Sequence, residues 1–220
     1  MNAPRMLRTG AALVAALLAA ACSDTLSLEG TGEVQVLMQR TAGSPIFPSA
    51  PDSAQAVRSV APDTVASLTV DVTSIEFLRV GGDSSQPNGW MSLSFDAPIR
   101  IDLMALPTES GSPLVVAEGS LAAGTYGRVR LFVMNPQIQF KGDVGFGGGN
   151  TLQGGVNHDV TIPSGDQTGL KTDVSFTVEA SGSGGTTADV GLLFDAGTTL
   201  GNVTVTGNGR VMLSPVLRAR

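Results

Sequence analysis

Apolar and polar residues alternate along most of the chain after residue 31, and this pattern constrains the fold more than any other feature. The clearest run spans residues 68–80, where Leu68, Val70 and Val72 fall on one face of an extended segment. Successive side chains of a strand point to opposite faces, so such alternation is typical of strands with one buried face. No segment after residue 32 shows a helical stripe bounded by capping residues, and only residues 52–60 are candidates for a helical turn.

The same alternation predicts a series of short strands separated by turns rich in Gly, Asn and Asp. They are expected at residues 33–39, 68–80, 90–95, 99–103, 114–117, 129–134, 138–140, 156–162, 174–178, 190–194, 203–206 and 211–217. Many short strands and few helices indicate an all-β fold, an antiparallel β-sandwich formed by a single domain over residues 32–220. Two segments are expected to be long loops, the Pro-rich residues 41–63 and the Gly-rich residues 142–155.

The first 22 residues are typical of a secretion signal that ends in a lipidation site. Arg5 and Arg8 precede an apolar stretch, residues 10–21, which is shorter than the about 20 residues needed to span a bilayer. The stretch ends in Leu-Ala-Ala-Ala-Cys22, which resembles a bacterial lipobox. Residues 1–21 are therefore predicted to be a lipoprotein signal peptide, with Cys22 carrying the acyl chains. The alternative is ordinary secretion, with cleavage after an Ala-x-Ala triplet and a chance Cys.

Lipidation would place the mature protein at the bacterial cell envelope, with residues 22–31 as a flexible tether. Removal of Arg5 and Arg8 with the leader changes the net charge from −6 to −8. Anionic headgroups would repel such a domain, so the acyl chains alone would hold it on the membrane. Ser23 directly after the Cys favours the outer membrane by the sorting rule of enteric bacteria. The acidic charge also excludes nucleic acid as a partner, because binding it requires a basic face.

The residue inventory limits the chemistry that the chain can perform. A single Cys and a single His, His158, exclude Cys clusters and His-rich metal centres. No Gly-x-Ser-x-Gly elbow accompanies His158, and the spacing around Lys171 departs from the phosphate-binding loop. The sequence therefore predicts a protein that is not an enzyme and has no cofactor.

Two classes of ligand are compatible with the remaining candidates. Extracytoplasmic sandwiches often bind Ca²⁺ through loop carboxylates, and the loop candidates are Asp83, Asp143, Asp166 and Asp195. Glycan binding needs exposed aromatic rings, and Trp90 and Phe146 are the candidates, although Trp90 begins a strand and also suits the core.

Three further features have local physical interpretations. Arg128 and Arg130 lie two residues apart in a predicted strand, so they share a face that is solvated, pairs with acidic residues across the sheet, or binds an anion. Gly124 permits a turn with positive φ, and Tyr126 is expected to bury its ring while its hydroxyl bonds a nearby carbonyl. Asp195 is expected to cap a turn by accepting backbone N–H groups.

Four motifs, in order along the chain, resemble the bacterial domain-of-unknown-function 4382 family. They are LAAGTYGRVRL at residues 121–131, PSG at 163–165 followed by GLK at 169–171, LFDA at 193–196 and GRVMLSPVL at 209–217. The resemblance covers about residues 32–217. It implies a secreted lipoprotein with a sandwich of the immunoglobulin or prealbumin type and no assigned biochemical role.

These observations together predict a lipid-anchored, non-catalytic β-sandwich of the cell envelope that serves as a binding or structural module. Its expected partners are the membrane, through the anchor, and an envelope protein or a glycan. The alternative is a carbohydrate- or calcium-binding surface domain that uses Trp90, Phe146 and the loop aspartates.

Overall fold

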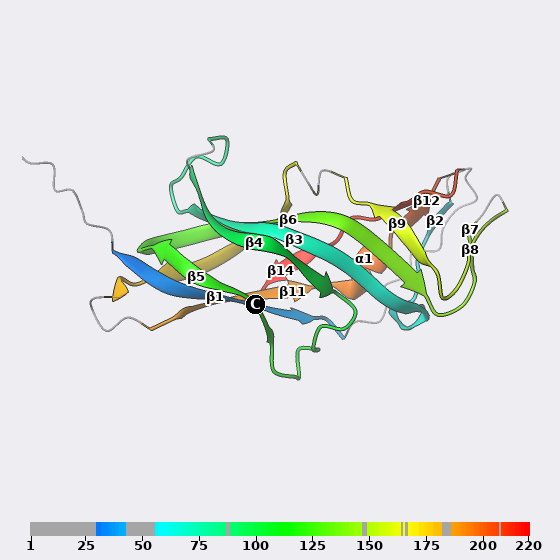
Figure 1. Ribbon diagram of the computed structural model, residues 1–220, viewed down its shortest axis with the longest axis horizontal. Coiled ribbons are helices and arrows are strands. Elements are labelled where there is room, and N and C mark those ends of the chain that lie inside the picture. Colours follow the sequence, from blue (N-terminus) through cyan, green and yellow to red (C-terminus); the bar gives the residue numbers. More distant parts are fainter. Residues whose placement is uncertain are drawn as a thin grey trace, which may run out of the picture.

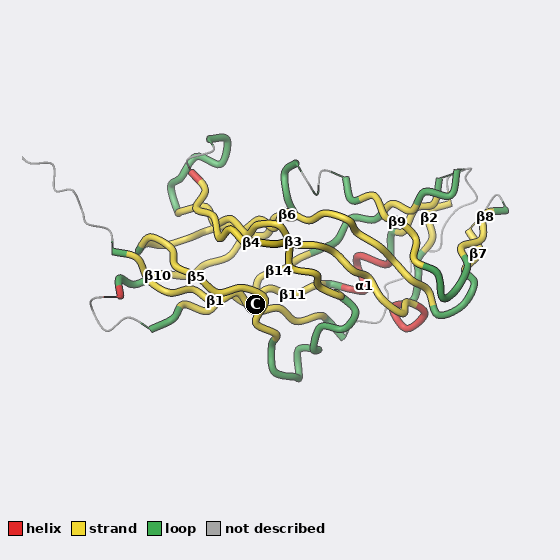
Figure 2. Tube along the Cα trace, viewed as in Figure 1, coloured by secondary structure: helices red, strands yellow, loops and turns green. Residues whose placement is uncertain are grey.

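The protein is built almost entirely of β-strands, as the alternation predicts (Figures 1 and 2). The computed structural model describes residues 30–42, 56–86, 89–146, 149–163, 165, 167–181, 186–206 and 208–220. The helical elements bounded within these residues include a 3₁₀ turn, Pro62–Thr64, and the short helix α1, Ala196–Leu200. No helix in the described residues has the length and apolar character needed to cross a membrane.

The larger of the two main sheets has eight strands and is organised around two long antiparallel strands, β3 and β6. Its strands are β2 (Ala56–Arg58), β3 (Val65–Arg79), β4 (Trp90–Asp102), β6 (Gly124–Phe140), β9 (Asn157–Thr161), β10 (Leu170–Val178), β12 (Val203–Val205) and β13 (Val211–Met212). β4 pairs with one edge of β3. The far edge of β6 is shared, because β10 pairs with its first half and β9 with residues 137–139 near its end.

The smaller sheet has four strands, and the first strand of the chain lies inside it. In spatial order they are β14 (Leu217–Ala219), β11 (Ala188–Phe194), β1 (Thr31–Arg40) and β5 (Leu114–Ala122). β1 runs antiparallel to β5 but parallel to β11, and β13 runs parallel to β9. The prediction of a purely antiparallel fold is therefore wrong for two strand pairs. Parallel neighbours need a long connection, and most of the chain lies between β1 and β11.

One apolar core fills the space between the two sheets. The alternating residues supply it as predicted: Val34, Val36 and Met38 come from β1, and Val70 and Val72 from β3. The opposite residues of these strands point away from the core, so each sheet has an outer face.

The two predicted loops contain strands. The Gly-rich segment holds a hairpin of β7 (Val144–Phe146) and β8 (Asn150–Leu152), at the end of the long axis opposite the start of β1 (Figure 1). The described part of the Pro-rich segment holds β2 and the 3₁₀ turn. The helical turn expected within residues 52–60 is absent from residues 56–60, while residues 52–55 lie outside the described residues.

Four predicted strands form two long strands in the structure. Each long strand continues through a proline by means of a bulge. β4 spans the predicted strands 90–95 and 99–103, with a register shift between Ser94 and Ile99 around Pro98. β6 spans 129–134 and 138–140, with a register shift close to Pro136. A bulge tolerates the missing N–H of proline, so the turn signals there mark irregular strands rather than strand ends.

Candidate functional site

The two aromatic candidates for glycan stacking are buried. Trp90 is 8% exposed, and its indole N–H donates to the carbonyl of Ser84 at 3.2 Å. The Arg130 guanidinium carbon lies 4.0 Å from the Trp90 ring centroid. Phe146 is 3% exposed and packs near Phe140. Neither ring presents an open face to a sugar in this conformation.

The loop carboxylates proposed for calcium are engaged in separate local contacts. Asp83 accepts hydrogen bonds from the hydroxyl and the backbone N–H of Ser85, and these lower its pKa. Asp143 accepts from the backbone N–H of Gly154 at 2.9 Å. Cys22 and Asp166 lie outside the described residues, and within those residues no group of three or more potential metal ligands occurs.

Asp195 caps α1, as the sequence predicts. Its carboxylate accepts from the backbone N–H and the hydroxyl of Thr198, each at 2.9 Å, and pairs with Arg218 at 2.5 Å. Burial acts to raise the pKa of Asp195, but these hydrogen bonds and the Arg218 charge outweigh it, so the pKa lies below its usual value. The backbone of Asp195 also donates to the Val216 carbonyl, so this residue fastens the C-terminal segment to the end of β11.

Tyr126 forms the predicted tyrosine corner. Its ring is fully buried, and its hydroxyl donates to the Ala122 carbonyl at 2.7 Å. Gly124 adopts a φ of 152°, so the turn into β6 uses the positive-φ region that the sequence predicts.

Arg128 and Arg130 lie on the outer face of the large sheet and pair with acidic residues across it. Arg128 contacts Asp173 of β10 at 2.8 Å. Arg130 contacts Glu76 of β3 at 2.5 Å, and its guanidinium carbon also lies 5.0 Å from the Phe132 ring centroid. The Arg130 side chain is only 18% exposed, so the Arg130 cluster, formed by Arg130, Glu76, Trp90 and Phe132, is closed.

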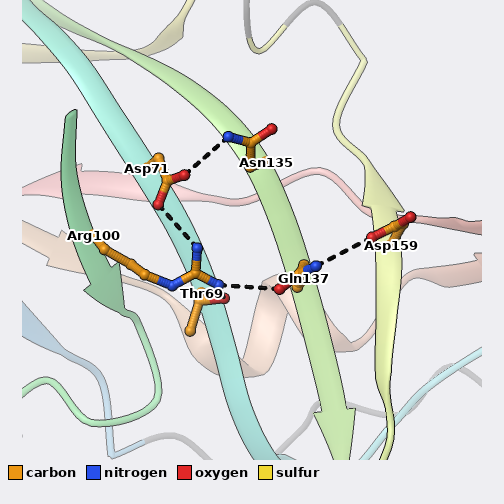
Figure 3. A network of polar contacts seen from close by, with 6 residues as sticks. All are labelled: Thr69, Asp71, Arg100, Asn135, Gln137 and Asp159. Atoms are coloured by element: carbon orange, nitrogen blue, oxygen red, sulfur yellow. Dashed lines mark hydrogen bonds and ion pairs between the residues drawn. The ribbon is translucent and has the colours of Figure 1, made fainter. Parts of the chain in front are cut away.

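A second polar group lies on this outer face, and three of its six residues are exposed; Figure 3 shows how they are joined. This group, here named the polar network, consists of Thr69 and Asp71 on β3, Arg100 on β4, Asn135 and Gln137 on β6, and Asp159 on β9. Its members are joined side by side across four neighbouring strands. The Arg100 side chain is 52% exposed, and Asn135 and Asp159 are also exposed.

Arg100 and the two amides connect the polar network. Arg100 donates to Asp71 at 3.2 Å, to the Thr69 hydroxyl at 2.9 Å and to the Gln137 amide oxygen at 3.0 Å. The Asn135 amide donates to the other oxygen of Asp71 at 3.0 Å. The Gln137 amide nitrogen donates to Asp159 at 3.2 Å. Charged and amide groups are thus held in a defined order along the sheet surface.

The backbone beside the polar network is irregular. Asn135 has a φ of 47°, a value outside glycine that is uncommon but tolerated by Asn. The register of β3 and β6 shifts between Thr69 and Asp71, opposite this residue. Bulges re-aim side chains and are frequent next to functional sites. Here the bulge accompanies the contact of the Asn135 amide with Asp71.

A surface hollow of about 320 Å³ adjoins the polar network. It is lined by Val133, Met134, Asn135, Pro136, Val160, Thr161 and Ile162, where β6 passes from pairing with β10 to pairing with β9. The chain crosses between these two strands beside the hollow, and the backbone of Gly165 accepts from the Val133 N–H at 3.2 Å. The hollow and the network share Asn135, so they adjoin at this residue.

Sequence reasoning did not find this surface. Its only local signal is the spacing of two between Thr69 and Asp71 and between Asn135 and Gln137, which places each pair on one face of a strand. The pairs come together only through the bulged register of β3, β4 and β6.

Comparisons with known proteins give one match. The family model described as a domain of unknown function (DUF4382) matches residues 58–215, which run from β2 to just beyond β13. No curated protein and no solved structure matches the chain.

Proposed function

The chain belongs to the DUF4382 family, and from that premise we propose that it is a lipid-anchored, non-catalytic β-sandwich module of the bacterial cell envelope. The observation that carries the proposal is the position of Cys22. The single Cys of the chain stands directly after a basic and then apolar leader, where a lipoprotein carries its acyl chains. Two or three acyl chains anchor a protein stably where one does not.

The geometry of the domain suits attachment at the start of β1. β1 begins at Thr31, at one end of the long axis, and the β7–β8 hairpin lies at the other end (Figure 1). Eight residues separate Cys22 from Thr31, and these nine steps along the chain span at most about 30 Å when extended. An anchor there would hold the Thr31 end near the membrane and leave the outer face of the large sheet accessible.

A sandwich of the immunoglobulin or prealbumin type is the fold we propose for the family. Two sheets that enclose one core, together with the Tyr126 corner, support this assignment. The parallel pairing of β1 with β11 makes it a variant with mixed sheets.

A non-catalytic role is supported by the local engagement of the candidate groups. The His158 ring is hydrogen-bonded to the Gln153 carbonyl at 2.9 Å, and the buried carboxylate of Asp195 serves as a helix cap. The exposed groups of the polar network can donate and accept further hydrogen bonds, and this property suits a binding role.

Fractionation of a Cys22→Ala variant tests the anchor. We expect the wild-type protein to enter the membrane fraction and to incorporate a labelled fatty acid, and the variant to do neither. Ser23→Ala is the matched control, because it changes the next residue and retains the thiol. A Cys22→Ala protein that stayed in the membrane fraction, or a wild-type protein without label, would overturn the proposal.

Placement in the outer membrane is tested separately by density-gradient separation of the two membranes. We expect the wild-type protein in the outer-membrane fraction and a Ser23→Asp variant in the inner-membrane fraction. Equal distribution of the two proteins would overturn the outer-membrane assignment while leaving the lipid anchor intact.

A further inference from the structure

We propose that the polar network binds a neutral polysaccharide chain laid across the outer face of the large sheet. The inference rests on the proposed function, since it names the ligand class of that binding module. It uses residues that differ from the aromatic and loop candidates of the sequence.

Sugar hydroxyls require donors and acceptors side by side, and the polar network offers both. An arginine has five N–H donors, and Arg100 directs three of its hydrogen bonds to Asp71, Thr69 and Gln137. A carboxylate accepts about four hydrogen bonds, whereas Asp71 accepts two and Asp159 one within the network. Arg100, Asn135 and Asp159 are exposed, so their unused capacity is available to a ligand, whereas the Asp71 side chain is 15% exposed and serves mainly to position Arg100 and Asn135.

The charge of the polar network favours a neutral ligand. Its one cation, Arg100, is already paired with Asp71, and Asp159 adds a second negative charge. An anionic chain would meet two carboxylates and a protein of net charge −6. A hydroxyl-rich neutral chain meets no such repulsion.

The scarcity of exposed apolar side chains on this surface disfavours a protein partner. Protein interfaces depend on buried aromatic and aliphatic anchors. Within the described residues, Met134 is the one large exposed apolar side chain that lines the hollow, and the Phe132 ring on the same strand has the Arg130 guanidinium carbon 5.0 Å from its centroid.

The dimensions suit a short stretch of sugar residues. The polar network crosses four strands, which is about 14 Å at the usual strand spacing. The adjoining hollow of about 320 Å³ offers the exposed Met134 and the half-buried Pro136 to the apolar faces of a sugar ring. Because no aromatic ring stacks on the ligand, the expected Kd is on the order of 0.1–1 mM for one site.

Affinity electrophoresis of the full-length protein provides the test, with calorimetric titration of any polysaccharide that retards it. The neutral probes are dextran, laminarin, pullulan and galactomannan, and polygalacturonate is the anionic counterpart. We expect retardation by at least one neutral probe and none by polygalacturonate. We expect Arg100→Ala and Asn135→Ala each to weaken binding about tenfold, as the loss of one or two hydrogen bonds predicts.

Arg128→Ala is the matched control. Arg128 also forms an exposed ion pair with an aspartate on this face, but it lies outside the polar network. We expect it to bind as the wild type does. Thermal melts of all three variants establish that each is folded before binding is compared.

Three results would overturn the inference: no retardation by any neutral probe, binding that survives both network substitutions, or a preference for polygalacturonate. The proposed function fails independently, through membrane retention of Cys22→Ala. We expect that variant, without its anchor, to bind the polysaccharide with the wild-type Kd.

Discussion

Two arginine ion pairs on the outer face of the large sheet have the same chemistry and different surroundings. Arg130 and Glu76 are 18% and 19% exposed, and the guanidinium lies against the rings of Trp90 and Phe132. Arg100 is 52% exposed and has only polar partners. The aromatic rings shield the Arg130 guanidinium from solvent, so this pair contributes to packing. The Arg100 guanidinium is exposed and can donate further hydrogen bonds. The burial of the guanidinium, rather than its charge, distinguishes the structural Arg130 from Arg100, which is accessible to a ligand.

Trp90→Ala should lower the stability of the protein most, because it removes the ring that covers the Arg130 guanidinium. Replacing a buried Trp by Ala usually costs about 3–5 kcal/mol. We expect the free energy of unfolding, measured with urea, to fall within that range. A loss below about 1 kcal/mol would show that the ring contributes little and that the cluster is not closed by it.

Glu76→Ala should be the next largest change, since it leaves the Arg130 guanidinium without its anion in a mostly buried position. We expect a loss of about 1–3 kcal/mol. The matched control is Asp173→Ala, because Asp173 pairs with Arg128 but is 79% exposed. Its loss should stay below about 1 kcal/mol. Equal losses in the two variants would contradict the role assigned to cover.

Asp195→Asn extends the comparison to a mostly buried carboxylate whose arginine partner, Arg218, is 58% exposed. The Asp195 side chain is 11% exposed, and its loss of charge should cost about 1–2 kcal/mol at pH 7. The pKa of Asp195 lies below 3.8 in the folded state, so its contribution is present above that pH and is lost as the pH falls below it.

Urea titrations of the wild type and Asp195→Asn at pH 7 and pH 3 measure this difference. The gap in stability between the two proteins should narrow at pH 3. A gap that is unchanged or wider at pH 3 would show that the carboxylate charge does not act as described.

Arg100→Ala should have the smallest effect on stability, below about 1 kcal/mol, because the Arg100 side chain is half exposed and the 15% exposed Asp71 keeps its hydrogen bond from Asn135. The same variant should show the tenfold loss of polysaccharide binding. A large loss of stability in Arg100→Ala would make the polar network structural and would remove the distinction between the two arginines.

The sequence predicts the local structural features better than it predicts the exposed polar network. The Tyr126 corner, the Asp195 cap and the shared face of Arg128 and Arg130 follow from local rules of turn chemistry and strand period. The polar network depends instead on which strands are neighbours and on bulges that shift their register. No local rule aligns Arg100 with Gln137, because β3 lies between their strands.

Local sequence patterns do not predict the order of the strands in the sheets either. Alternation predicts that β1 has one buried face, but it does not predict that β11 is its parallel neighbour. Hairpins arise between consecutive strands, and the sequence indicates those through turn residues. The pairing of Val36 with Val190 joins distant parts of the chain and has no such signal.

The central place of β1 in the small sheet has a consequence for the order of folding. A chain that emerges from its N-terminus presents β1 first, yet both neighbours of β1 come later, and β11 belongs to the last fifth of the sequence. Contacts so distant along the chain slow folding, because the connecting segment must be ordered first. The small sheet therefore closes only after β11 has been synthesised, and until then β1 lacks one of its two neighbours.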